Sequence, residues 1–400
     1  MSPDSAAAIR ASLERPPATP PFDAVDAIAL PFRIVFFPIR VIGKANAKLV
    51  GQLAKLAKPR EATLFERLAD EGLRPAFGGL GPRSGFAAGL RIDRWRPLVL
   101  ETGFSIRGSQ RHLIGFDFDS PLYRFQPTYM FQRDAEPHFW GIGPDTEKND
   151  VRDYQLDRQV ATAIGTLRLR GLNLIAGAGY QDNRVSRGSD EDTGDLPDLP
   201  DDERPYGVDE RTKYFVFSAS GVFDRTFMVS HQRRGVFLEV GSSLFLGVDG
   251  TESDFHRINL TVHSYAPINP RQSLALRGLA ELNRGRGEGI PFFHLARLGD
   301  EAGSRAYKRD RFRDRDMAAI MSEWRYEVWR ELHNRGRVES FLFLDTGAVD
   351  HKLTQISFSQ LRWSYGFGFR VIWSNQVRWL AYLGFGDDGA RIDVTFSWVY

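Results

Sequence analysis

The stretch Arg391-Ile-Asp-Val-Thr-Phe-Ser-Trp-Val-Tyr400 alternates between polar and apolar side chains from Arg391 to Trp398. Successive side chains of a β-strand point to opposite faces, so this stretch has one polar and one apolar face. A tilted strand of roughly ten residues, at about 3.3 Å each, can cross the apolar band of an outer membrane. A soluble sandwich would instead bury the apolar face in a core. Aromatic rings at the end of the strand would lie where lipid meets water, as amphipathic rings prefer. The apolar face consists of Ile392, Val394, Phe396, Trp398 and Tyr400.

The same alternation recurs from residue 73 onward, in segments separated by short turns. We therefore predict an all-β fold: a sixteen-stranded antiparallel transmembrane β-barrel, preceded by a short N-terminal amphipathic helical segment. The even strand number is that of bacterial single-chain barrels. The predicted strands are 73–80, 85–94, 98–107, 112–120, 128–142, 154–168, 172–185, 213–223, 236–246, 255–265, 273–282, 318–329, 338–347, 364–373, 377–385 and 391–400.

The composition of the chain excludes several classes of protein. There is no Cys, which rules out disulfides and thiolate metal sites. The net charge of +2 argues against a nucleic-acid binder. The mean hydropathy of −0.34, without a long uncharged apolar run, predicts no membrane-spanning helix. No P-loop, nucleophile elbow or His-Glu-x-x-His motif is present, so we expect no enzyme, no catalytic residues, no metal and no cofactor. An outer-membrane lipase or protease, assembled from distant Ser and His residues, stays as an alternative.

The first 72 residues differ in character from the rest of the chain. Residues 1–21 are rich in Pro, Ala and Ser and are predicted to be disordered. They contain no apolar core of a signal peptide, so an outer-membrane location requires that such a signal was removed. Residues 22–72 are predicted to form an amphipathic helical segment, which lies on the membrane surface or else packs on the barrel or plugs its periplasmic mouth. The membrane-surface residues of this segment are Phe32, Phe36, Phe37, Lys44, Lys48 and Lys55.

Two long connections interrupt the strands. Residues 189–203 are strongly acidic and predict a solvated outward loop, with binding of a divalent cation as the alternative. Residues 283–316 end in the charged run EAGSRAYKRDRFRDRD, which begins at Glu301. By composition this run is a solvated loop as well. A connection of this length in a compact barrel is usually functional, so we predict that it folds into the lumen while most of its charges stay in water.

Period two places Glu323, Phe343 and Asp345 on the lumen faces of two neighbouring strands. Unpaired carboxylates in a narrow lumen are costly, so a cationic partner is expected. Arg305 of the loop suits both carboxylates, because its planar guanidinium bonds them in pairs and stacks on aromatic rings. Phe343 or Tyr307 would supply the ring. The alternative is that the two carboxylates pair across strands with other lumen charges.

At this point a set of motifs resembles the bacterial surface antigen superfamily of outer-membrane assembly factors, which includes BamA, TamA and FhaC. Ser304-Arg305-Ala306-Tyr307 is similar to the lumen-loop motif of that family, an apolar residue followed by Arg-Gly-Phe or Arg-Gly-Tyr. Ser304 and Ala306 depart from it, and Ala306 requires a backbone without positive φ. The resemblance covers residues 73–400. The further motifs are Leu298-Gly299, Arg311-Phe-Arg-Asp314, Glu323-Trp-Arg325, Phe343-Leu-Asp345-Thr-Gly347, Phe139-Trp-Gly-Ile-Gly-Pro-Asp-Thr146, Tyr180-Gln-Asp-Asn-Arg-Val185 and Asp224-Arg225.

The resemblance implies that Arg305 anchors the loop to Glu323 and Asp345 inside the barrel. It also implies that strands 73–80 and 391–400 pair weakly and form a lateral gate into the bilayer.

The implied function is non-enzymatic insertion or translocation of proteins, or handling of lipids, at the outer membrane of a Gram-negative bacterium. The implied partners are the lipid bilayer and an unfolded protein or lipid substrate, with a monomeric barrel. A passive or partner-gated channel is the alternative. The polypeptide-transport repeats of the family are not recognisable in residues 22–72. Phe396, Trp398 and Tyr400 resemble the C-terminal signal by which barrels are recognised for insertion.

Overall fold

The computed structural model describes residues 68, 71–80, 83–190, 192–229, 232–251, 253–285, 289–330, 336–373, 376–396 and 398–399, with side chains up to residue 395. All of them belong to the larger of two compact units, Lys58–Tyr400. The predictions for residues 1–21, for the membrane-surface segment and for Tyr400 therefore lie outside the described residues. So do those for the side chains of Phe396 and Trp398.

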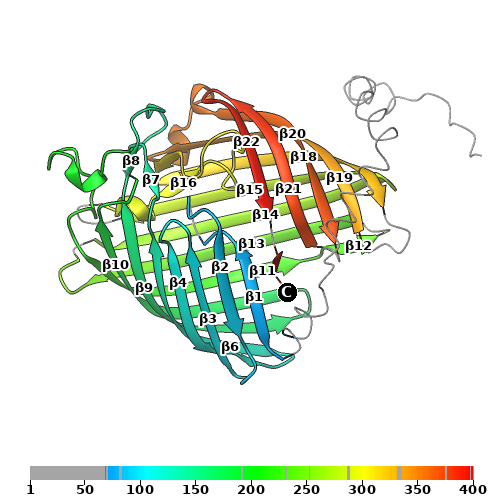
Figure 1. Ribbon diagram of the computed structural model, residues 1–400, viewed down its shortest axis with the longest axis horizontal. Coiled ribbons are helices and arrows are strands. Elements are labelled where there is room, and N and C mark those ends of the chain that lie inside the picture. Colours follow the sequence, from blue (N-terminus) through cyan, green and yellow to red (C-terminus); the bar gives the residue numbers. More distant parts are fainter. Residues whose placement is uncertain are drawn as a thin grey trace, which may run out of the picture. The chain divides into compact units, whose positions relative to one another are not determined.

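The described part of the chain folds into a nearly closed antiparallel barrel of sixteen strands, as predicted (Figure 1). Each strand pairs with its neighbour in the sequence. The barrel strands are β1 (Leu73–Gly78), β2 (Ala87–Ile92), β3 (Leu98–Ser105), β4 (Gln110–Phe116), β6 (Tyr123–Asp134), β9 (Gln155–Leu169), β10 (Leu172–Ser186), β11 (Thr212–Asp224), β13 (Gln232–Val248), β14 (Phe255–Asn269), β15 (Gln272–Gly285), β18 (Asp316–Arg330), β19 (Gly336–Asp350), β20 (Arg362–Trp373), β21 (Gln376–Gly386) and β22 (Gly389–Phe396).

Short elements extend the barrel or lie in its loops. The extensions are β5 (Phe118–Asp119), β12 (Phe227–Val229) and β23 (Trp398–Val399). The loop strands are β7 (His138–Phe139), β8 (Arg152–Asp153), β16 (Ala296–Leu298) and β17 (Phe312–Asp314). The described ranges also contain four short 3₁₀-helices: η1 (Leu196–Asp198), η2 (Phe292–His294), η3 (Leu353–Gln355) and η4 (Phe358–Gln360). No helix within the described ranges has the length and apolar character needed to cross a bilayer.

The faces of the strands follow the predicted alternation. In β19, Leu344 is 50% exposed, whereas its neighbours Phe343 and Asp345 are 4% and 1% exposed. The outward position of Leu344 suits lipid, and the inward positions line the lumen. Ile320 of β18 and Ile392 of β22 are likewise exposed.

The bounds of the predicted strand 128–142 are wrong at both ends, although residues 128–134 do belong to a strand. The observed strand, β6, runs from Tyr123 to Asp134, and the following residues form a loop that contains β7 and β8. Pro127 explains the misplaced start. Pro127 lies in β6 opposite the break between β4 and β5. The N–H that proline lacks therefore has no hydrogen-bond acceptor to serve on that side. Gly141 and Gly143 have φ values of 100° and 108°, which end any strand in the second half of the prediction.

The longest connections all lie at one end of the barrel, which also has short turns such as Asp387–Asp388. The long end holds the loops β6–β9, β10–β11, β15–β18 and β19–β20, whereas the other end has tight turns such as Arg170–Gly171. Outer-membrane barrels have short periplasmic turns and longer extracellular loops, so the long end faces the exterior.

The barrel closes between its first and last strands. β1 pairs with β23 at Ala76–Val399 and Phe77–Trp398. Figure 1 shows β1 in blue and β22 in red on the same side of the barrel. We call the line between β1 and β22–β23 the seam.

Candidate functional site

The loop between β15 and β18 is the most unusual part of the interior. Within its charged run, Arg305, Arg311 and Arg313 are 7%, 2% and 1% exposed. The prediction that most charges of this run stay in water is therefore wrong. Local composition cannot show this burial, because the partners of these side chains come from distant strands and loops.

Arg305 lies between the two predicted carboxylates. Its Nε and Nη2 atoms donate to Asp345 Oδ2 and Oδ1 at 2.8 and 2.6 Å. This is a bidentate interaction, which lysine cannot make. Its Nη1 atom donates to Glu323 Oε1, and its backbone N–H donates to Asp345 Oδ2 at 3.2 Å. Ser364 adds a hydroxyl bond to Asp345 at 3.2 Å. The buried negative charges are thus met by a cation and by further hydrogen bonds, as a buried ion pair requires.

A stack of rings and guanidinium groups supports this ion pair. The guanidinium of Arg305 lies 4.1 Å from the centre of the Phe343 ring, and that of Arg370 lies 4.4 Å from Phe341. Arg370 also donates to Glu323, as does Arg325. Glu323 therefore has partners in the loop and in the strands, so the alternative of pairing between strand charges holds alongside the loop contact.

Arg370 was not among the predicted site residues, whereas Phe341 shares the predicted lumen face of Phe343 and Asp345. Period two within the predicted strand 364–373 places Arg370 on the same face as Ser364, which would have revealed it as a lumen cation.

Glycines on the neighbouring strand make room for the rings. A Cβ atom added at Gly366 would lie 2.7 Å from Phe343 Cζ, and one added at Gly368 would lie 2.5 Å from Phe341 Cζ. These distances are too short for any other residue without movement of the rings. Gly366 and Gly368 therefore leave β20 without inward side chains where these rings pack, and the Phe343 ring in turn supports Arg305.

Tyr307 contacts the end of the barrel rather than Arg305. Its hydroxyl donates to Asp387 Oδ2 at 3.1 Å, in the turn between β21 and β22. Arg391 of β22 donates to the Tyr307 carbonyl at 2.6 Å and pairs with Asp300 of the loop at 3.1 Å. The loop is thus bonded to a strand of the seam as well as to β18 and β19.

Arg311 and Arg313 hold the outer part of the loop. Arg311 donates from Nη1 to Thr146 Oγ1 at 2.6 Å and pairs with Asp388 at 2.8 Å. Arg313 donates to Tyr154 Oη at 3.0 Å and to the His138 carbonyl at 2.9 Å. The loop between β6 and β9 and the loop between β15 and β18 therefore form one capping layer.

Replacement of Gly384 is expected to displace the tip of the loop. A Cβ atom there would lie 3.2 Å from Phe343 Cζ and 3.3 Å from Ala306 Cα, so Gly384→Val overpacks the contact. We expect a loss of about 1–3 kcal/mol of stability and greater proteolysis of residues 301–310. The matched control is Gly221→Val, because a Cβ atom at Gly221 meets nothing within 4 Å. Equal proteolysis of both variants and the parent protein would show that this contact does not position the loop.

The acidic stretch 189–203 shows bonds to cationic side chains. Arg83 donates to Asp190 at 2.8 Å and Arg187 donates to Asp198 at 2.6 Å. Across the residues that the structure describes, no group of three or more His, Cys, Asp or Glu is arranged to hold a metal ion.

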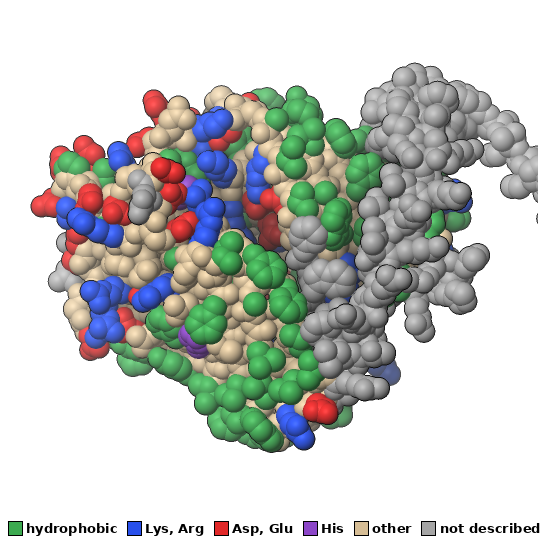
Figure 2. Space-filling model, viewed as in Figure 1, with side chains coloured by type: hydrophobic (Ala, Val, Ile, Leu, Met, Phe, Trp, Pro, Cys, Tyr) green, Lys and Arg blue, Asp and Glu red, His purple; other side chains and the backbone are tan. Residues whose placement is uncertain are grey.

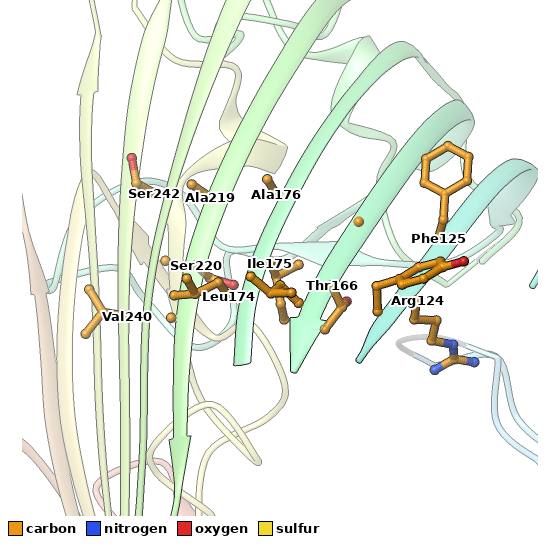
Figure 3. A pocket seen from close by; sticks show the side chains of 15 residues that line it. Arg124, Phe125, Thr166, Leu174, Ile175, Ala176, Ala219, Ser220, Val240 and Ser242 are labelled. Atoms are coloured by element: carbon orange, nitrogen blue, oxygen red, sulfur yellow. The ribbon is translucent and has the colours of Figure 1, made fainter. Parts of the chain in front are cut away.

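A separate apolar hollow of about 860 Å³ crosses β6, β9, β10, β11 and β13 (Figure 3). Small residues such as Ala176 and Ala219 form its floor, and exposed Leu174 and Val240 flank it. Arg124 points away from Phe125 in this view and pairs with Asp117 at 2.7 Å, outside the lining. The hollow therefore has no free charged group in its lining and is not the candidate site.

The loop inside the lumen and the sixteen-strand barrel can now be compared with known proteins. The model of the Omp85 superfamily domain matches residues 86–375, well over half of the chain. The chain belongs to the Omp85 superfamily. It is accordingly a β-barrel of the Gram-negative outer membrane. No curated protein sequence matches it.

Two solved Omp85-type structures have a similar fold. One is BamA from Haemophilus ducreyi lacking POTRA domains 1–3, with 12% identity and a TM-score of 0.57, and the match covers 82% of this chain and 69% of that one. The other is CdiB from Escherichia coli, with 14% identity and a TM-score of 0.55, and the match covers 82% of this chain and 63% of that one. At these identities the likeness supports the barrel fold alone, and this chain spans only about two thirds of either structure.

Proposed function

We propose that this Omp85 barrel inserts β-strand proteins into the outer membrane, without enzymatic chemistry, by accepting strands at its seam. The observation that carries the proposal is the free edge of β22. Among the described residues, β22 pairs with β21 along Gly389–Phe396 but has no partner on its other edge. On the seam side, β1 pairs only with β23. The register of β1 and β23 places residues 79–80 and 83–86, which lie outside any strand, opposite β22. An unpaired edge offers N–H and C=O groups that an incoming strand can bond.

The loop inside the lumen would regulate this edge. Arg391 lies on β22 and bonds the backbone of the loop, while Arg305 bonds the loop to β18 and β19. Movement of the loop would therefore change the support of β22 from within. In this proposal the barrel acts as a monomer in the lipid bilayer, and its substrate is an unfolded outer-membrane protein.

A disulfide across the seam tests the proposal. The chain has no Cys, so Ala76→Cys with Val399→Cys gives one pair at directly opposed positions. Opposed Cα atoms of antiparallel strands are about 4.5–5.5 Å apart, which suits a disulfide. In proteoliposomes, we expect the oxidised variant to lose acceleration of the insertion of an unfolded eight-stranded barrel protein. Reduction should restore it.

The control is Ala163→Cys with Ala178→Cys, an opposed pair between β9 and β10 far along the sheet from the seam. This disulfide should leave insertion unchanged. Insertion at the parent rate with the seam locked would refute the proposal. Passage of the client into the vesicle lumen would favour translocation, and steady conductance without a client would favour a channel.

A further inference from the structure

A chamber of about 1320 Å³ lies behind the seam, between β1, β22 and the loop inside the lumen. Figure 2 shows Lys, Arg, Asp and Glu side chains gathered in a hollow near the centre of the same face, with hydrophobic side chains around it. Its rim includes Gly79 and Phe86 on one side of the seam and Val394 and Thr395 on the other. The chamber therefore opens where β22 lacks a strand partner among the described residues.

The acidic residues of the chamber already have cationic partners. Asp300 and Asp393 pair with Arg391 at 3.1 and 2.6 Å, and Glu301 pairs with Arg309 at 3.6 Å. The remaining two pair with arginines as well: Asp310 with Arg297 and Glu323 with Arg305.

Lys308 has no such partner. Its exposed side chain lines the chamber, and its ammonium group forms no ion pair with a carboxylate of the described residues. Burial, followed by the nearby cations Arg83 and Lys148, lowers the pKa of Lys308. The carboxylate of Asp388 opposes this shift without cancelling it, so an anion beside the ammonium group would stabilise its charged form.

Two buried side chains beside Lys308 also lack hydrogen-bond partners. Trp140 and His138 line the chamber and are 3% and 6% exposed. Neither the indole Nε1 of Trp140 nor a ring nitrogen of His138 has a partner among the described residues. The Nε2 atom of His138 lies 3.6 Å from Asp190 Oδ2, too far for a hydrogen bond. The ammonium of Lys308 lies 5.9 Å from the centre of a Trp140 ring, so these groups share one corner of the chamber.

The donors define the ligand. An indole N–H and an ammonium group can only donate, and burial with the Arg83 charge lowers the pKa of His138 to about 4, so its neutral ring offers one N–H at pH 7. Water could satisfy each of these donors separately, whereas one phosphate group could accept from all three and also pair with the exposed charge of Lys308. We propose that Lys308, Trp140 and His138 form a binding site for a phosphate group, carried by a lipid headgroup or present as a free ion. Residues on both sides of the seam line the chamber, so a headgroup would reach the site from the bilayer through the seam. The site does not depend on strand insertion as the function.

Binding of two phosphate probes to the full chain in an uncharged detergent tests the site. The probes are inorganic phosphate and dihexanoyl phosphatidic acid, titrated at constant ionic strength with sodium chloride. We expect saturable binding, seen as a rise in Tm and a change in tryptophan fluorescence. Lys308→Gln should weaken it at least about tenfold, because a charge-assisted bond is lost. Trp140→Phe should weaken it by about two- to tenfold. Lys213→Gln, which removes the same charge from a lysine paired with Asp249, should bind like the parent protein.

The probes also separate the sources of the phosphate group. Tighter binding of the lipid, in competition with inorganic phosphate, identifies a headgroup site. Saturable binding of inorganic phosphate alone identifies a site for the free ion, and either result supports the proposal. Binding to correctly folded Lys308→Gln and Trp140→Phe at the parent affinity would overturn the proposal. So would changes in Tm and fluorescence that are the same when sodium chloride replaces the phosphate probe.

Discussion

Arg305→Ala is expected to release the loop from the lumen and to lower stability by about 3–5 kcal/mol, because it leaves Asp345 and Glu323 as buried charges without this partner. Arg370 and Arg325 still bond Glu323, so the larger part of the loss should come from Asp345. The measurements are Tm in detergent, conductance in planar bilayers and proteolysis of residues 301–310. We expect a lower Tm, higher conductance and faster cleavage.

Two further variants make this experiment decisive. Arg309→Ala removes an exposed guanidinium of the same loop, 3.6 Å from Glu301, and should change stability by about 0–1 kcal/mol. Adding Asp345→Asn to Arg305→Ala removes the uncompensated charge and should recover part of the lost stability. An Arg305→Ala protein with the Tm, conductance and cleavage pattern of the parent would show that Arg305 does not anchor the loop.

Arg313→Ala is expected to open the capping layer while the tip of the loop stays in the lumen. Arg313 is 1% exposed, bonds Tyr154 and the His138 carbonyl, and lies over the rings of Phe139 and Phe292. Its removal leaves a cavity and unpaired buried acceptors, for which we expect a loss of about 3 kcal/mol or more. Limited proteolysis should show new cleavage within residues 135–153 but not within 301–310.

Arg315→Ala is the control for this variant. Arg315 lies two residues further along, and its guanidinium makes no hydrogen bond with the described residues. The free energy of unfolding of Arg315→Ala should therefore lie within about 1 kcal/mol of that of the parent protein. If Arg313→Ala instead gives the cleavage pattern of Arg305→Ala, the cap and the lumen contact form one cooperative unit.

Period two explains why the lumen wall could be predicted. Side-chain direction in a strand is set locally, so Glu323, Phe343 and Asp345 could be placed on the inner face before any tertiary contact was known. The same rule failed at Pro127. Whether a proline fits a strand depends on what its partner strand does at that point, which the alternation does not contain.

The sequence by itself determined the barrel, its strand order and the inward face that carries the two carboxylates. The tertiary structure alone decided that Arg311 and Arg313 are buried and that glycines of β20 admit the rings. It also decided that, among the described residues, β22 has a free edge beside a chamber lined by both cationic and acidic side chains. The physical reason is the range of the interactions. Alternation follows from neighbouring residues, whereas Arg313 meets its partners Tyr154 and His138 only after the loops have packed together.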